Sequence, residues 1–190
     1  MTLFRREATR NDGPIDFVGD SLVINLEWDL SADLDLAAVC DAESDNEIEM
    51  VFFDQPGRRS STPFVHLLGD SSGAGRTKFR KEHMVITRAS ANRAIHIFVW
   101  DHRGVMEGEA ADFLNNNDSV TVKAIDGNNQ VVSAALFESR GVNCVHVFTI
   151  ENNTIEVVDK SMRIPNTEKL AIGLVDLIKR HRASQTAEAV

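Results

Sequence analysis

The chain has 190 residues, 43% hydrophobic and 26% charged, which is the size and composition of one globular domain and not of a disordered polypeptide. Its formal net charge of -9 disfavours nonspecific binding to nucleic acid, which is itself a polyanion. The N-terminal segment lacks the apolar run of a secretory signal, and no stretch reaches the roughly 20 apolar residues that span a bilayer. We therefore expect a cytoplasmic protein without an integral membrane segment.

The first predicted elements follow a polar lead-in. Residues 1–20 contain Gly13-Pro14 and predict an irregular N-terminal arm. After them, short apolar runs rich in β-branched residues recur between turn signals and predict strands. In chain order these runs are 22–28, 34–40, 48–53, 64–68, 83–87, 95–100, 120–125, 131–137, 142–150 and 154–158, with one or two helical turns expected within 107–114.

Turn chemistry between these runs predicts antiparallel pairing. Asp126-Gly127-Asn128-Asn129 separates two apolar runs and is a strong hairpin signal, and Glu151-Asn152-Asn153 is a second one. About ten strands at short spacing without long intervening helices favour two packed sheets over alternating β-α units. The predicted fold class is all-β, an antiparallel two-sheet β-sandwich.

The C-terminal segment changes period. After Pro165, Leu170, Leu174, Leu177 and Ile178 fall on one helical face, which predicts an amphipathic helix. We expect its apolar stripe to pack on the sandwich and not on a membrane, because its polar face carries both signs of charge. The predicted domain spans residues 21–182, and residues 183–190 are expected to form a flexible tail.

Two cysteines constrain the chemistry only weakly. Cys40 and Cys144 each lie in an apolar run and have no zinc-like spacing, so we expect buried, reduced thiols.

The main candidate site is acidic. In an extended segment Asp33 and Asp35 point to the same side, while Leu34 and Leu36 point to the other. Two neighbouring carboxylates repel unless a cation, a basic side chain or water lies between them, and calcium prefers such oxygen ligands. Asp54, at a strand-to-loop junction, is a candidate third ligand. The alternative is two solvated acids on the polar face of a strand.

An enzymatic interpretation rests on residues 69–77. Gly69-Asp70-Ser71 resembles a serine-nucleophile turn, but no histidine of the chain lies in a sequence motif typical of the catalytic base that such a serine needs. The same residues imitate a phosphate-binding loop without its lysine, and the following segment predicts a strand where such a loop requires a helix. We therefore expect that the protein is not an enzyme.

Four ordered segments carry a family resemblance. They are Leu26-Glu27-Trp28-Asp29, Ala32-Asp33-Leu34-Asp35-Leu36-Ala37-Ala38, Met50-Val51-Phe52-Phe53-Asp54-Gln55 and Val65-His66-Leu67-Leu68-Gly69-Asp70-Ser71. Their order and spacing resemble those of the tellurium resistance TerD family of stress proteins. The resemblance covers residues 20–182 and thins after residue 100, where the strand pattern and the final helix sustain it.

This resemblance implies a calcium-binding β-sandwich that acts in bacterial resistance to tellurite and other stresses, beside partner proteins of the same system. It implies no known reaction. Asp33 and Asp35 match the family's Asp-x-Asp ligands, and Asp70 matches the aspartate of its Gly-Asp-Asn turn. Asp54 stands where the family usually has asparagine.

The chain also departs from the family pattern. The glycine-rich acidic run that follows the turn in family members is replaced here by a segment that contains Arg76 and Lys78. Cations in place of carboxylates remove ligands and add repulsion, so we expect a weakened calcium site. Arg76 or Lys78 is a candidate to occupy the place of the ion.

Two hypotheses follow. The first is a non-enzymatic stress-response binding module with a residual calcium site formed by Asp33, Asp35, Asp70 and Asp54. The second is a metal-free structural or scaffold subunit, which self-assembles into a homo-oligomer or binds protein partners through the sandwich edges and the terminal helix.

Overall fold

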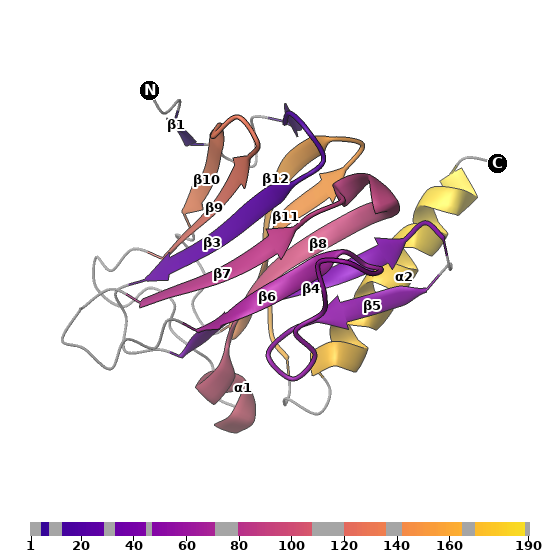
Figure 1. The fold of residues 1–190 in the computed structure, drawn as a ribbon. Helices are drawn as coiled ribbons and strands as arrows, with labels where there is room; N and C mark the ends of the chain where they lie inside the picture. The colour runs from indigo at the N-terminus through magenta and orange to yellow at the C-terminus, as the bar shows by residue number, and fades with distance from the viewer. Residues whose placement is uncertain are drawn as a thin grey trace.

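The computed structural model describes residues 5–7, 13–28, 33–44, 47–70, 80–107, 120–135, 142–164 and 170–188. Within these residues twelve strands form two facing sheets (Figure 1). The first sheet has the order β1 (Arg5–Glu7), β10 (Val131–Ala135), β9 (Thr121–Asp126), β3 (Leu22–Trp28), β7 (Arg80–Ile86) and β6 (Val65–Asp70). The second has the order β2 (Ile15–Asp16), β12 (Thr154–Met162), β11 (Cys144–Glu151), β8 (Asn92–Asp101), β4 (Leu34–Ala42) and β5 (Ile48–Val51).

The predicted all-β sandwich is confirmed. The ladders within each sheet are antiparallel except for the short pairing of β1 with β10, which is parallel. Each of the ten apolar runs contains a strand, but β7 begins at Arg80, ahead of the predicted start at His83. Its polar first residues pair with the end of β3, Arg80 opposite Trp28, so the backbone ladder extends the strand past the apolar pattern.

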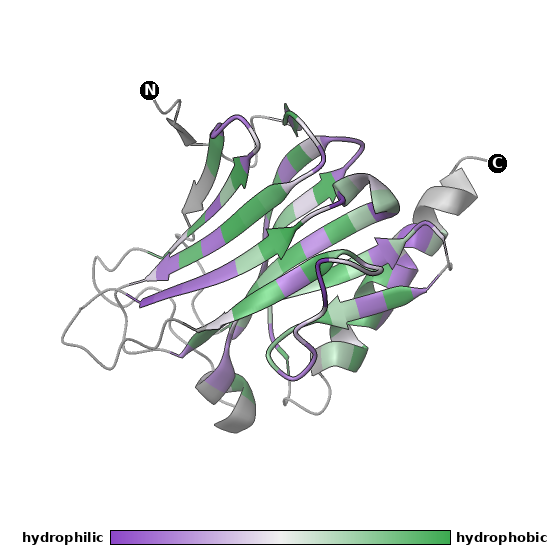
Figure 2. Ribbon diagram, viewed as in Figure 1, coloured by the Kyte–Doolittle hydropathy of each residue, from purple (hydrophilic) through white to green (hydrophobic). Residues whose placement is uncertain are grey.

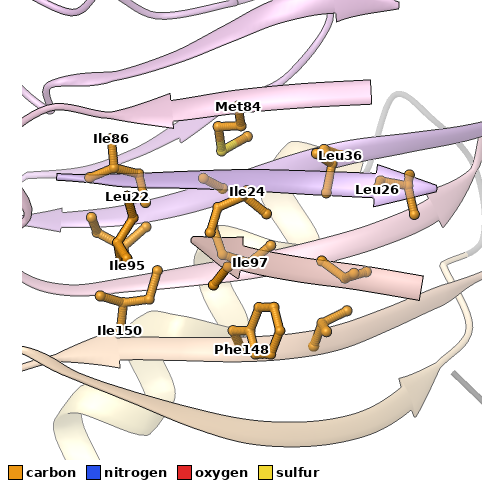
Figure 3. Close-up of a cluster of buried hydrophobic side chains, with 14 of the residues drawn as sticks. Leu22, Ile24, Leu26, Leu36, Met84, Ile86, Ile95, Ile97, Phe148 and Ile150 are labelled. Atoms are coloured by element: carbon orange, nitrogen blue, oxygen red, sulfur yellow. The ribbon is translucent and has the colours of Figure 1, made fainter. Parts of the chain in front are cut away.

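The main core lies between the two sheets. Along β3 the side chains alternate between buried and exposed, and Leu22, Ile24 and Leu26 point inward. Figure 3 shows Leu22 and Ile24 facing Ile95 and Ile97 of the second sheet, and Leu26 beside Leu36. Burial of each such side chain stabilises the fold by about 1.5–3 kcal/mol.

A second core covers the outer face of the second sheet. The helix α2 (Leu170–Glu188) packs Leu174 and Ile178 against Ala37, Val39 and Phe98. Figure 1 shows α2 behind this sheet, and Figure 2 shows the alternation of hydrophobic and hydrophilic residues along the strands. The predicted amphipathic helix is therefore confirmed. The flexible tail is wrong for residues 183–188, because α2 continues to Glu188.

The irregular N-terminal arm is wrong for residues 5–7, which pair with β10, and for residues 15–17. Ile15 and Phe17 are buried in the main core, and β2 pairs with β12. The backbone N–H of Phe17 donates to the carbonyl of Asn153 at 3.0 Å, and that of Val18 donates to Asp126 Oδ2 at 2.9 Å. The sandwich therefore begins within the segment assigned to the arm.

The two predicted hairpins are confirmed. Asp126 closes the β9–β10 turn by accepting the backbone N–H groups of Asn128 and Gln130 through Oδ1. The β11–β12 turn holds Asn152 and Asn153 at φ of 50° and 59°, a left-handed conformation that asparagine tolerates well.

The sandwich has two unlike ends. The turns at residues 43–47, 87–91, 127–130 and 152–153 lie at one end, here called the hairpin end. Strands β3, β6, β8 and β10 end, and β4, β7, β9 and β11 begin, at the other end, here called the loop end, where Trp28 pairs with Arg80 and Leu34 with Asp101. The short helix α1 (His102–Glu107) follows β8 there, ahead of the helical turns expected within 107–114, of which residues 108–114 lie outside the described residues. Functional residues concentrate on loops that a rigid scaffold positions. The loop end also carries Asp33, Asp35 and Asp70.

The cysteines lie on opposite faces of the second sheet. Cys40 belongs to the core between the sheets and Cys144 to the core under α2, and both thiols are free. Burial raises the pKa of each thiol far above its usual value. The prediction of buried, reduced thiols is therefore confirmed. In the part of the chain that the structure describes, no helix is long and apolar enough to cross a membrane.

Gly57 gives a test of how the edge of the first sheet is covered. Its segment lies along β6, where the carbonyl of Pro56 accepts the Leu67 N–H at 2.8 Å. Gly57 has φ +69°, and a Cβ there would meet the Val65 carbonyl oxygen at 2.2 Å. We expect Gly57→Ala to lower the free energy of unfolding by about 1–3 kcal/mol more than Gly19→Ala.

Gly19→Ala is the matched control, because Gly19 has φ +92° and a Cβ added there would have nothing within 4 Å. It therefore carries the backbone strain alone. Urea unfolding of both variants measures the difference, and equal destabilisation would contradict the close approach at β6.

Candidate functional site

The predicted acidic pair lies where β4 begins at the loop end. Leu34 and Leu36 are buried in the main core, and Asp35 faces the opposite side of the strand, as the alternation predicts. Asp33 precedes the strand and is exposed, and its backbone carbonyl accepts the N–H of His102 at 2.8 Å.

Each carboxylate of the pair has its own basic partner. Arg80 Nη1 lies 3.8 Å from Asp33 Oδ1, and His102 Nδ1 lies 3.2 Å from Asp35 Oδ2. Arg80 begins β7 in the first sheet, so its pair with Asp33 joins the two sheets. The two side chains of this pair are 45% and 56% exposed, so it stabilises the fold by only about 0–1 kcal/mol.

The sequence anticipated a basic side chain in the place of an ion but assigned it to Arg76 or Lys78. Both lie outside the described residues. In the described residues the basic side chain beside Asp33 is Arg80, two positions beyond Lys78. The sequence alone could not show which of these neighbouring cations would reach the carboxylate. His102 was missed because only the pairing of β8 with β4 brings it to Asp35.

The other two predicted ligands lie in different settings. Asp54 is exposed in the turn after β5. Asp70 ends β6 with its Cα aligned to that of Glu82, and its side chain lies outside the described residues. Across the described residues, no three His, Cys, Asp or Glu side chains come together as a group that could hold a metal ion. The four-residue calcium site stays a prediction.

An aromatic cluster flanks the Asp35–His102 pair. The ring centroid of His102 lies 5.1 Å from that of Trp100 and 5.2 Å from that of Phe53. Phe53 also stacks on Trp100 at 5.9 Å while remaining 43% exposed. The cluster shields one side of the imidazole and presents an exposed aromatic ring at the loop end, a feature common in protein interfaces.

A buried acid supports this end from inside the sandwich. Glu82 is 2% exposed and accepts the backbone N–H of Leu36 from the opposite sheet. Because β5 stops opposite Ala38, Glu82 takes the place of a further strand residue at this N–H group. The sequence pattern hides Glu82 within a polar run, so its interior position was not predicted.

Glu27 forms a charged group on the outer face of the first sheet near the same end. Its carboxylate accepts hydrogen bonds from Lys81 at 2.9 Å and from Lys123. Partial burial acts to raise the pKa of Glu27, but the hydrogen bonds and charges of the two lysines outweigh it. The pKa therefore lies below its ordinary value of 4.5.

The phosphate-binding interpretation of residues 69–77 requires a helix directly after the loop. Residues 71–79 lie outside the described part of the chain, and the next element, β7, is a strand. A phosphate-binding loop would open a helix at this point.

Comparison with known proteins adds no identification, since neither a protein-family model nor a curated protein matches the chain.

Glu82 gives a stability test of the bridge between the sheets. We expect Glu82→Ala to lower the free energy of unfolding by about 2–5 kcal/mol, because it leaves the Leu36 N–H without this acceptor and opens a cavity. Glu82→Gln retains the shape and an acceptor oxygen, and should cost clearly less. Denaturant unfolding compares the two variants, and equal losses would show that the hydrogen bond to Leu36 contributes nothing.

Glu27 gives a pH test. Its folded pKa is lowered, so its contribution is complete above the ordinary pKa of 4.5 and is lost as the pH falls through the folded pKa. Glu27→Gln should cost about 1 kcal/mol at neutral pH, with the difference from the unmodified protein shrinking in acid. Unfolding curves from pH 7 downward measure it, with the exposed Glu156→Gln as the control. A difference that does not change with pH would contradict the two lysine contacts.

Proposed function

We propose that the chain is a non-enzymatic protein-binding module that acts at its loop end without a bound metal. One observation carries the proposal: Asp33 and Asp35 are each matched by a basic group of the chain itself, Arg80 and His102. A carboxylate that already has a donor within the chain gains less from a cation, because the ion must displace that contact.

The surroundings of this pair favour binding over catalysis. Exposed Phe53 offers apolar contact area beside the Asp35–His102 pair. Asp33 and Arg80 add exposed charges of both signs, which suit a polar interface rim.

The biological setting of the proposal rests on the TerD resemblance. It places the module in a bacterial stress response of the tellurite-resistance type, where its partners are other proteins of that system or a second copy of this chain. The net charge of -9 agrees with a protein partner better than with nucleic acid.

A residual calcium site is the second candidate. It is favoured by the exposure of Asp33 and by the length of its contact with Arg80, 3.8 Å, which a bound cation can replace. Asp70 ends β6 close to the start of β7, so its backbone lies at the same end. Calcium would then join acidic segments that otherwise repel.

Calcium titration separates the two candidates. For the metal-independent module we expect the same melting temperature in chelator and in millimolar calcium, and no heat of binding by calorimetry. Ligand that binds only the folded state raises stability by RT ln(1 + [L]/Kd), so a calcium site would raise the melting temperature. A calcium-dependent rise that Asp33→Asn/Asp35→Asn abolishes would overturn the metal-independent proposal.

A second experiment tests whether the chain associates with itself through the loop end. Sedimentation velocity across a concentration series should show assembly of the chain. Asp33→Asn/Asp35→Asn should weaken it only slightly, because the pair is not an ion site and exposed rim charges contribute little to affinity. Phe53→Ser should weaken assembly, whereas Val18→Ser, at another exposed apolar side chain away from the Phe53 cluster, serves as the control. Assembly that is unaffected by Phe53→Ser would exclude the loop end as the contact surface between copies.

A further inference from the structure

A second site lies at the opposite end of the sandwich. A cleft of about 710 Å³ opens beside α2, over the end of β4 and the start of β8, and the β11–β12 turn forms another wall. Asp41 in this cleft and Asp35 at the loop end are six residues apart on β4, which corresponds to about 20 Å along a strand. The cleft is therefore separate from the proposed protein-binding end, and its volume suits a small molecule.

The inner wall carries a cluster of three ionised side chains. Asp41 is buried, and its Oδ1 accepts from Arg93 Nε at 3.0 Å and Nη2 at 2.5 Å. Arg182 of α2 reaches the same oxygen at 3.4 Å. Two guanidinium groups thus share one buried carboxylate, which holds both of them at the wall of the cleft.

Both arginines remain accessible from the cleft they line. Their side chains are about a third exposed, 34% for Arg93 and 35% for Arg182. Arg93 is also fixed through Nη1, which donates to the carbonyl of Glu43 at 3.4 Å. A guanidinium held in place by a buried carboxylate is a preorganised donor for an anionic group, because its orientation is set before a ligand arrives.

The outer wall has the opposite charge. Glu43 and Glu151 line the cleft and are exposed, at the ends of β4 and β11. Their carboxylates would repel a ligand that is only anionic, such as inorganic phosphate, and the two arginines would repel one that is only cationic. The remaining polar lining includes His96, whose Nδ1 lies 3.2 Å from Thr149 Oγ1.

We infer that this cleft binds a small zwitterion, a free amino acid or dipeptide. The ligand carboxylate lies against Arg93 and Arg182, and its ammonium group lies toward Glu43 and Glu151. This assignment uses both signs of charge in the lining, and it is independent of the proposed function of the loop end.

The test uses L-alanyl-L-alanine, its N-acetyl derivative and its C-terminal amide as probes of the full-length protein. Titrations followed by NMR amide shifts should show saturable binding of the dipeptide, with changes at residues of the cleft. The N-acetyl derivative lacks the ammonium group and the amide lacks the carboxylate, so each should bind at least about tenfold more weakly. Inorganic phosphate should not compete.

Variants assign the two charges separately. Arg182→Gln should remove the preference for the dipeptide over its amide, and Glu151→Gln should reduce the preference for the dipeptide over its N-acetyl derivative. Lys179→Gln, an exposed change on the same helix outside the cleft lining, is the matched control. Glu151 is exposed at the end of β11, so its variant tests the assignment even if Arg182→Gln disturbs the Asp41 cluster.

Two results would overturn the inference. One is the absence of saturable shifts with the dipeptide at millimolar concentration. The other is equal binding of the dipeptide and both blocked derivatives, which would show that the charges of the cleft do not recognise the ligand termini.

Discussion

The second sheet is covered on both of its faces, by the first sheet on one side and by α2 on the other, and much of the molecule follows from this double burial. Polar side chains on its strands cannot simply turn to water, so they require partners. Asp41 is met by Arg93 and Arg182, Asp35 by His102, and the neighbouring His96 and His146 share contacts with Thr149.

The same burial lowers the reactivity of the two cysteines. Cys40 and Cys144 lie on opposite faces of this sheet, each in its own apolar cluster, and burial raises both thiol pKa values. A thiol that stays protonated is a poor nucleophile and a poor metal ligand.

The charged side chains discussed above gather at the two opposite ends of the sandwich, for different reasons. At the loop end, residues from both sheets meet, and Arg80 and His102 contact the acids at the start of β4, Asp33 and Asp35. At the hairpin end, short turns and α2 leave a cleft whose walls differ in charge. One strand, β4, carries an acid at each end, so a single rigid element positions both sites.

Local features of the sequence determined the strands, the two asparagine hairpins and the buried stripe of α2. Their signals are periodicity and turn chemistry, which depend on residues close together in the chain. The sequence also located Asp33 and Asp35 at the start of a strand with Leu34 and Leu36 facing the core. It misjudged residues 5–7 and 15–17, because pairing with distant strands decides whether a polar stretch joins a sheet. It also ended the final helix before Glu188.

Only the tertiary structure decided which charges meet. Arg80 reaches Asp33 across the two sheets, His102 reaches Asp35 through the pairing of β8 with β4, and Glu82 turns inward to a backbone group of the facing sheet. The cleft combines Asp41, Arg93 and Arg182, which come from β4, β8 and α2. Such encounters depend on sheet order, register and helix docking, and no spacing along a single sequence encodes them, since the partners lie tens of residues apart.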